Sequence, residues 1–197
     1  MNIVIIDYGA GNIQSIKFAL ERLGYQGKLS SDAKEIMSAD KVIFPGVGEA
    51  SSAMKKLRST GLDKIIPELK QPVLGICLGM QLMSRNSEEG GTAGLGIFDV
   101  DVIQFEKTLK VPHIGWNRIT DLKTHLFKGI REKEYVYLVH SYYAPLCSET
   151  IAKCDYGVEY SSALKKGNFY GVQFHPEKSS AAGEKILENF LKLEVRS

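Results

Sequence analysis

Residues 72–82 read Pro-Val-Leu-Gly-Ile-Cys-Leu-Gly-Met-Gln-Leu. The first part of this stretch, Pro72–Ile76, is a short apolar run, which predicts a strand that is buried on both faces of a parallel sheet. The second part, Leu78–Arg85, predicts a helix that follows the strand after a sharp turn. A strand that passes directly into a helix is typical of the βαβ units of an open parallel sheet.

The segments before this stretch repeat the same alternation of strand and helix. Asn2–Asp7 and Lys41–Phe44 are apolar runs, which predict two further buried strands. Asn12–Leu23 carries apolar residues at helical spacing, and a second helix is predicted through Ala50–Leu57. The first strand and its helix are joined by a turn that we predict at Gly9-Ala-Gly11-Asn12.

After about ninety residues the alternation of strand and helix patterns ends, and predicted strands separated by turns follow. Three segments predict antiparallel strands that are added to the sheet or packed beside it: Gly96–Phe105, Val111–Thr120 and Tyr135–Tyr142. The chain closes with a predicted strand, Asn168–Phe174, and a helix over about Ser180–Leu193. Because no linker divides it, we expect one domain over residues 1–197. The expected class is α/β, with an open, mostly parallel, flavodoxin-like sheet, helices on both faces and added antiparallel strands.

The composition excludes several classes of function. The net charge is +2, from 25 basic and 23 acidic residues, so nothing indicates a nucleic-acid or membrane partner. No apolar run is long enough to span a bilayer, and the first residues read as a strand rather than a signal peptide. Three cysteines, Cys77, Cys147 and Cys154, argue against a disulfide framework, and no histidine has zinc spacing. We therefore expect no metal and a reduced, cytoplasmic setting.

Cys77 lies in the pattern Gly75-Ile-Cys-Leu-Gly79, between a predicted strand and a predicted helix. This is the pattern of a nucleophile elbow, with sulfur in place of a hydroxyl group. The sharp turn strains the backbone, and side chains at the flanking glycine positions would collide with it. The dipole of a helix that begins at Leu78 favours the reactive thiolate. Taken alone, the pattern fits a small buried cysteine about equally well, and we expect the other two cysteines to be structural.

His175 is the first candidate for the base that such a nucleophile needs. It ends the predicted strand over Asn168–Phe174, at the carboxyl edge where parallel sheets build sites, and Cys77 ends its own strand in the same way. Glu177 follows after one proline, and its carboxylate can accept the Nδ1–H of His175 and stabilise the imidazolium. His-Pro-Glu alone also fits a strand end before an ordinary turn. The other histidines are a second candidate that also ends an apolar strand, His140, and two expected structural or surface residues, His113 and His125.

An amide carbonyl under attack becomes a negatively charged oxygen, which backbone N–H groups usually hold. The N–H of Leu78, directly after the candidate nucleophile, is one expected donor. We expect the second donor from the turn Pro45-Gly46-Val47-Gly48, because it follows a buried strand and its glycines let the backbone approach closely. The same turn also fits a simple connection before a helix.

Three segments occur in the order of a known family: Pro45-Gly-Val-Gly48, Gly75-Ile-Cys-Leu-Gly-Met-Gln81 and Gly171-Val-Gln-Phe-His-Pro-Glu177. Together they resemble the class I, or triad, glutamine amidotransferases, over essentially the whole chain. The resemblance implies the fold of that family and a triad that hydrolyses L-glutamine to glutamate and ammonia without a cofactor. It also implies three residues that help to hold the α-amino and carboxylate groups of glutamine: Gln81, Ser141 and Tyr142.

Further segments narrow the resemblance within this family: Asp7-Tyr-Gly-Ala-Gly-Asn12, Pro112-His-Ile-Gly-Trp-Asn117, Val139-His-Ser-Tyr142 and the lysine at position 178. They are similar to glutaminase subunits of histidine biosynthesis, which deliver ammonia to a separate (β/α)8-barrel cyclase subunit in a heterodimer. This resemblance implies four residues that lie toward the partner: Asn12, Trp116, Tyr137 and Lys178. Trp116 and Tyr137 also fit inward packing, and Lys178 also fits a solvated loop.

Other readings remain open on the sequence. Gly9-x-Gly11 resembles part of a dinucleotide-binding fingerprint, although Gln14 occupies the position of the third glycine. The triad alone also fits a cysteine peptidase or esterase on a related scaffold, against which the segments 45–48 and 112–117 argue. Another class I amidotransferase subunit would differ in the partner that stimulates it. A catalytically silent relative is disfavoured, because all three triad residues are present.

Overall fold

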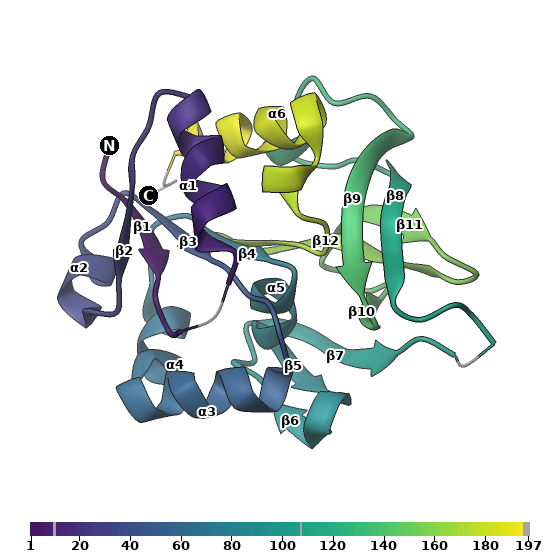
Figure 1. Cartoon of the computed structure of the whole chain (residues 1–197), viewed down its shortest axis with the longest axis horizontal. Coiled ribbons are helices and arrows are strands. Elements are labelled where there is room, and N and C mark those ends of the chain that lie inside the picture. The colour runs from purple at the N-terminus through teal and green to yellow at the C-terminus, as the bar shows by residue number, and fades with distance from the viewer. Residues whose placement is uncertain (10, 107, 195–197) are drawn as a thin grey trace.

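The computed structural model describes residues 1–9, 11–106 and 108–194. Within these ranges the strands form one sheet with the order β2-β1-β3-β4-β13-β12-β10-β7-β5-β6, from which β11, β8 and β9 branch (Figure 1). The predicted α/β class, with parallel strands and added antiparallel ones, is confirmed. Ala10, in the turn predicted at Gly9–Asn12, lies outside the described residues.

The parallel half of the sheet contains the strands predicted from apolar runs. Its members are β1 (Ile3–Ile6), β2 (Gly27–Ser30), β3 (Lys41–Phe44), β4 (Val73–Ile76) and β13 (Phe169–Val172). All neighbours among them pair in parallel. Only β2 has no counterpart among the predicted strands. It is the edge strand and is partly solvated, so Gly-Lys-Leu-Ser carries no apolar run.

Helices cover both faces of this half, as predicted. Figure 1 shows α1 (Ile13–Arg22) and α6 (Ser180–Leu191) on one side of the sheet and α3 (Ala50–Thr60) with α4 (Leu62–Ile65) on the other. Alternate residues of β1 enter two separate cores: Ile3 and Ile5 pack with α1 and α6, whereas Val4 and Ile6 pack with α3. The remaining helices are short: α2 (Ala33–Met37), α5 (Leu78–Leu82), η1 (Ile66–Glu68), η2 (Glu89–Gly91), η3 (His125–Phe127) and η4 (Pro176–Lys178).

The antiparallel strands continue the sheet beyond β13. They are β12 (Glu159–Lys166), β10 (Tyr142–Pro145), β7 (Phe98–Gln104), β5 (Ser84–Ser87) and β6 (Thr92–Ala93), with the branch β11 (Thr150–Asp155), β8 (His113–Thr120) and β9 (Glu134–His140). Within this group only β5 and β7 pair in parallel. The hairpin of β11 and β12 is absent from the prediction, since polar residues interrupt its apolar pattern.

Two predicted boundaries are wrong. The helix predicted over Leu78–Arg85 ends at Leu82, because Ser84 begins β5, which pairs with β6 and β7. The strand predicted over Tyr135–Tyr142 is two strands, because the chain leaves β9 after His140 and enters β10 at Tyr142. None of the helices in the described ranges is long and apolar enough to cross a membrane.

Candidate active site

Cys77 occupies a strained turn between β4 and α5. Its backbone φ is 53° and its ψ is −110°, a positive φ that residues other than glycine rarely adopt. The N–H of Cys77 donates to the carbonyl of Val172 on β13 at 2.8 Å, which holds the turn against the neighbouring strand. The strained geometry expected of a nucleophile elbow is therefore confirmed.

Three glycines are required by the close packing around this turn. A Cβ atom on Gly79 would lie 2.0 Å from the carbonyl oxygen of Phe44, and one on Gly75 would lie 2.8 Å from the backbone nitrogen of Met80. A Cβ atom on Gly46 would lie 2.5 Å from the backbone nitrogen of Gly79. Carbon atoms cannot approach so closely. The glycines thus allow β3, β4 and α5 to meet at the elbow.

His175 and Glu177 reach the same edge from the adjacent strand. β4 and β13 are parallel neighbours with Ile76 opposite Val172, so their carboxyl ends coincide. Nδ1 of His175 lies 2.8 Å from Oε1 of Glu177, and both side chains are buried. The side chains of His175 and Cys77 lie beside one another at the cavity, where the two groups interact. Because Glu177 engages Nδ1, the other ring nitrogen is left for the sulfur.

The electrostatics of this group favour a charged imidazole. Burial lowers the pKa of His175, but hydrogen bonds to Cys77 and Glu177 outweigh burial and raise the pKa to about 10. An imidazolium beside a cysteine favours the thiolate, which is the nucleophilic form. Oε2 of Glu177 is buried and has no hydrogen-bond partner among the described residues, so this carboxylate is committed to the histidine.

A cavity of about 350 Å³ opens over the sulfur. Its lining joins Cys77 and His175 to further residues singled out from the sequence: Val47, Gly48, Leu78, Gln81, Ser141, Tyr142 and Lys178. Gly46 does not line the cavity and instead packs beneath the elbow. Glu89, which was not singled out from the sequence, is the one carboxylate among the described lining residues. The volume suits a small molecule, and a single carboxylate suits an ammonium group.

Gln81 and Gln173 form a buried link between the cavity wall and the sulfur. Nε2 of Gln81 donates to the carbonyl of Tyr142 and to Oε1 of Gln173, both at 2.9 Å. Nε2 of Gln173 donates to Sγ of Cys77 at 3.6 Å. Gln173 is fully buried and was not singled out, although it lies inside the quoted segment 171–177. The available signal was a polar residue inside an apolar predicted strand, two positions before the candidate base.

The other histidines do not act as a base in this arrangement. His140 lines the cavity, but burial lowers its pKa to about 3, and both of its ring nitrogens have hydrogen-bond partners. His113 is also buried, and its ring stacks on Tyr156 with centroids 3.8 Å apart. His125 is exposed on η3. The structure therefore favours His175 over His140 as the base, and the burial of His113 and the exposure of His125 agree with the structural and surface positions expected of them.

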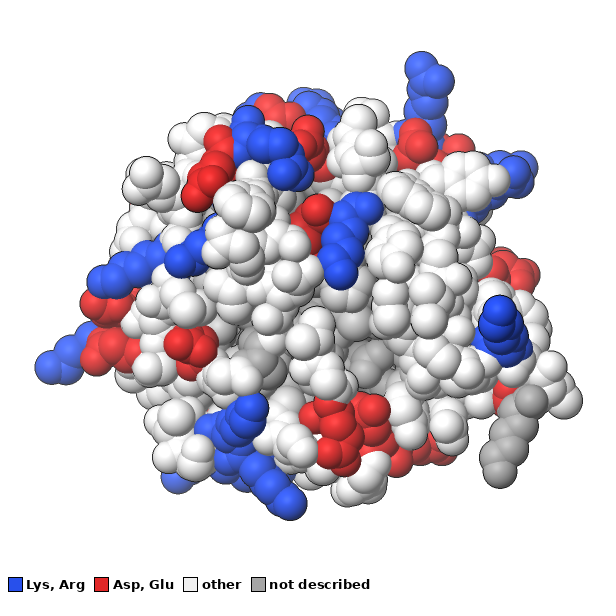
Figure 2. All heavy atoms as spheres, in the orientation of Figure 1, with Lys and Arg blue, Asp and Glu red and all other residues white. Residues whose placement is uncertain are grey.

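The aromatic face, which we define as Ile114, Trp116, Tyr135 and Tyr137, covers the outer side of β8 and β9. Trp116 is 51% exposed and lies opposite Tyr137, with ring centroids 5.9 Å apart. Ile114 and Tyr135 are 60% and 44% exposed on the same side of the strands. In Figure 2 the surface right of centre, where Figure 1 places these strands, is largely free of charged side chains. Arg118 also lies on this side, with its guanidinium group 5.0 Å from the ring centroid of Tyr135, so the face is largely apolar. Exposed patches of this kind are typical of surfaces that contact another molecule.

This face is bonded directly to the backbone of His175. The N–H of His175 donates to the carbonyl of Tyr137 at 2.9 Å. The N–H of Tyr137 donates to Oγ of Ser179 at 2.9 Å, and that hydroxyl donates to the carbonyl of His175 at 2.7 Å. A molecule that contacts Tyr137 would therefore contact a residue that is hydrogen-bonded to the backbone of His175. The other two residues placed toward a partner differ: Lys178 is exposed at the cavity and Asn12 is half-buried before α1.

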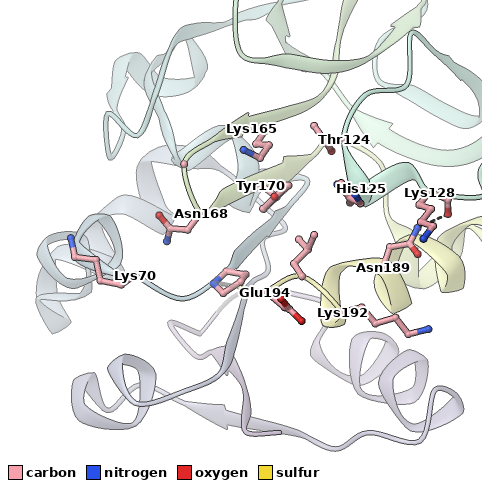
Figure 3. A pocket seen from close by; sticks show the side chains of 13 residues that line it. Lys70, Thr124, His125, Lys128, Lys165, Asn168, Tyr170, Asn189, Lys192 and Glu194 are labelled. Carbon is pink, nitrogen blue, oxygen red and sulfur yellow. Dashed lines mark hydrogen bonds between the residues drawn. The ribbon is translucent and has the colours of Figure 1, made fainter. Parts of the chain in front are cut away.

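A larger cavity, of about 930 Å³, lies at the opposite edge of the sheet, next to the residues that precede β4 and β13 (Figure 3). Lysines dominate its rim, but Figure 3 shows the side chains of Lys70 and Lys192 extending away from its centre. Lys192 pairs with Glu188, Lys165 lies over the ring of Tyr170, and Glu194 adds a carboxylate. No candidate catalytic, substrate-binding or partner-facing residue from the sequence is among the described residues that line it, so the candidate site is the smaller cavity.

Comparisons with known proteins agree with this geometry. The family model "Glutamine amidotransferase class-I" matches residues 4–193. "Imidazole glycerol phosphate synthase subunit HisH" of Bacteroides fragilis strain YCH46 is 56% identical over 196 residues, which cover 98% of this chain and 100% of the relative. The protein of that name from Escherichia coli K12 is 50% identical over the same shares.

Solved structures show the same fold at low sequence identity. A structure described as a glutamine amidotransferase has a TM-score of 0.75 and 18% identity, and the match covers 96% of this chain and 97% of that one. A glutamine amidotransferase from Thermotoga maritima has a TM-score of 0.64 and 17% identity, over 96% of this chain and 82% of that one.

Proposed function

Because this chain belongs to the class I glutamine amidotransferases, we propose that it is the glutaminase subunit of an imidazole glycerol phosphate synthase. It hydrolyses L-glutamine to glutamate and ammonia, and a partner subunit consumes the ammonia. The partner makes imidazole glycerol phosphate and an aminoimidazole carboxamide ribotide in L-histidine biosynthesis. This subunit is therefore the hydrolase within a complex that acts as a lyase. The observation that carries the proposal is the Cys77–His175–Glu177 group at the cavity of a chain more than half identical to such subunits.

The proposed chemistry uses two steps at the sulfur. The thiolate of Cys77 attacks the amide carbon, and His175 protonates the leaving nitrogen as the C–N bond breaks, which releases ammonia and leaves a thioester. Water then attacks the thioester with His175 as the base, the C–S bond breaks, and glutamate leaves. Glu177 keeps His175 in one tautomer and stabilises its charged form through both steps.

The oxyanion of each step needs two donors. Leu78 is the first residue of α5 and lines the cavity, so its N–H has no acceptor within the helix and we assign the first donor to it. The turn at Val47 and Gly48 also lines the cavity, and we assign the second donor to it. Gly48 has a φ of 96°, and a Cβ atom there would meet nothing within 4 Å, so this turn has room to change its backbone direction.

Glutamine enters the cavity with its amide at Cys77. Glu89 supplies the negative charge that its α-ammonium group needs, and Ser141 and Tyr142 offer hydrogen bonds at the same wall. Gln81 has both amide hydrogens committed to Tyr142 and Gln173. It therefore shapes the wall and contributes its oxygen rather than its N–H groups.

The partner of the proposed complex is a (β/α)8-barrel cyclase subunit, in a heterodimer, and the cytoplasm is its proposed location. Ammonia that escaped into neutral water would be protonated and lose its nucleophilicity, so delivery inside a complex is chemically favoured. The aromatic face supplies the docking surface, since it is exposed, apolar and bonded to His175 through Tyr137. Trp116 is its central anchor. Asn12 and Lys178 are assigned to the same side of the complex.

The test combines the purified chain with a separately purified cyclase subunit, its ribotide substrate and L-glutamine labelled with ¹⁵N at the amide. We expect turnover only when both subunits are present, with the label in imidazole glycerol phosphate. Turnover with ammonium salts shows that the cyclase is active. If the cyclase works with ammonium but never with glutamine and this chain, the proposal fails. Stimulation by a different synthase subunit instead would assign the chain to another class I amidotransferase.

A further inference from the structure

A buried chain of hydrogen bonds runs from β8 to the wall of the glutamine cavity. His113, Tyr160 and His140 form its centre, and all three are at most 6% exposed. Nδ1 of His113 lies 3.4 Å from the hydroxyl of Tyr160, and that hydroxyl lies 3.1 Å from Nε2 of His140. Nδ1 of His140 lies 2.8 Å from the carbonyl of Tyr142 in the cavity wall. None of these three side chains takes part in the proposed proton transfers.

One direction of donation satisfies every member of this hydrogen-bond chain. The carbonyl of Tyr142 only accepts, so Nδ1 of His140 carries the hydrogen. Burial lowers the pKa of His140 to about 3, so its ring is neutral and its Nε2 accepts from the hydroxyl of Tyr160. The oxygen of Tyr160 then accepts from Nδ1 of His113. Each group therefore donates toward the cavity.

This series of hydrogen bonds begins in the segment 112–117. Burial lowers the pKa of His113 to about 4, so this ring is neutral too, and its Nε2 lies 3.5 Å from the amide nitrogen of Asn117. That amide also donates to the carbonyl of Asp155 at 2.8 Å, which fixes its orientation. Residues 113 and 117 face inward on β8, whereas Trp116 on the same strand faces outward.

Beyond the carbonyl of Tyr142 the bonding continues to the sulfur. This carbonyl also accepts from Gln81, whose amide donates its second hydrogen to Oε1 of Gln173. Gln173 consequently turns its Nε2, rather than its oxygen, toward Sγ of Cys77. An amide oxygen at that position would repel a thiolate, whereas an N–H group stabilises it. The position of the Tyr142 carbonyl therefore decides which end of Gln173 the sulfur meets.

We propose that His140 is a positioning residue of the glutaminase reaction. Its bond to the carbonyl of Tyr142 keeps Gln81 and Gln173 in the orientation that aims an N–H group at Cys77, and Tyr160 with His113 holds His140 in the required tautomer. This role deepens the proposed function and rests on it. His140 is not assigned a proton transfer or a bond to substrate. It acts on Cys77 indirectly, through the carbonyl of Tyr142 and the two glutamines.

The test compares His140→Leu with His140→Asn. Leucine removes the donor, whereas the amide nitrogen of asparagine occupies nearly the place of Nδ1 and can still donate to Tyr142. Tyr160→Phe removes only the hydroxyl that fixes the tautomer. The first readout is the rate of alkylation of Cys77 by iodoacetamide at neutral pH, followed on the peptide that contains Cys77. The second is kcat and KM for glutamine with the cyclase subunit bound.

We expect at least about fivefold slower alkylation and a lower kcat for His140→Leu, a smaller loss for Tyr160→Phe, and rates within about twofold of wild type for His140→Asn. Phe105→Leu is the packing control, because Phe105 is buried with its ring centroid 5.2 Å from that of His140 and offers no hydrogen bond. Wild-type alkylation in a folded His140→Leu protein, or an equal loss in Phe105→Leu, would overturn the proposal. Alkylation needs no glutamine, so its response separates a failure of this inference from a failure of the proposed glutaminase activity.

Discussion

The parallel half of the sheet and the antiparallel strands build the two sides of the candidate site by different means. The parallel half supplies Cys77, His175 and Glu177 from the ends of adjacent strands, and it fixes the elbow by steric contact, through glycines that allow backbones to touch. The antiparallel strands supply the cavity wall and the aromatic face, and they are joined to the triad through hydrogen bonds. The backbone turn that carries the nucleophile is thus fixed by packing, whereas the cavity wall and the aromatic face are joined to the triad by polar contacts.

The largest expected effect comes from the parallel side. Cys77→Ala should lower glutamine hydrolysis by roughly 10⁴- to 10⁶-fold, because the acyl acceptor is lost. Production of glutamate by the complex is the measurement. Cys147→Ala, at a half-buried cysteine outside the cavity, is the control and should retain activity. Turnover in Cys77→Ala near the wild-type level would show that Cys77 is not the nucleophile.

Packing at the elbow should show next in the free energy of unfolding. Gly79→Ala places a Cβ atom 2.0 Å from the carbonyl oxygen of Phe44, and we expect a loss of about 3 kcal/mol or more. Gly61→Ala is the control: Gly61 has a φ of 74°, whereas Gly79 lies in α5, so the control carries a backbone cost of about 1 kcal/mol but its Cβ atom meets no atom within 4 Å. Urea denaturation of both variants measures the difference. Equal losses would show that contact at the elbow is not decisive.

Substitutions on the aromatic face of the antiparallel strands should change the affinity for the cyclase subunit rather than the stability of the fold. Trp116→Ala should weaken the complex with the cyclase subunit by about 2 kcal/mol, roughly 30-fold in Kd, since it removes the central exposed aromatic anchor. Met37→Ala changes a side chain of similar exposure, 57%, on α2, away from the aromatic face, and should leave Kd unchanged. Titration calorimetry measures both. Unchanged binding in Trp116→Ala would place the docking surface elsewhere.

A separate effect should appear in the dependence of stability on pH. The pKa of His140 is lowered to about 3 in the folded chain, so the unfolded chain binds its proton first as the pH falls below about 6.5. This group's contribution is fully present above pH 6.5 and is lost toward pH 3, at up to about 1.4 kcal/mol per pH unit. His140→Asn should flatten the decline in unfolding free energy between pH 6 and 4 relative to wild type. Parallel curves would show that His140 is not buried in its neutral form.

The same contrast explains what could be predicted from the sequence. The strand residues 41–44 and the elbow around Cys77 were predictable, because burial on both faces and a glycine-flanked turn leave local patterns. The edge strand β2 and the hairpin of β11 and β12 left none, since each is polar in places. Hydrogen-bond partners were out of reach for another reason. Gln173, Ser179 and His140 gain their roles from residues up to 96 positions away, which no local spacing encodes.

The most direct test of the central claim traps the nucleophile. A glutamine analogue with a diazoketone in place of the amide alkylates a thiolate in the cavity, with loss of dinitrogen and formation of a stable thioether. In the complex with the cyclase subunit, we expect one adduct per chain, on the peptide that contains Cys77, and loss of glutamine hydrolysis in proportion to its formation. Inactivation without an adduct on Cys77, or continued hydrolysis after Cys77 is fully modified, would contradict the account.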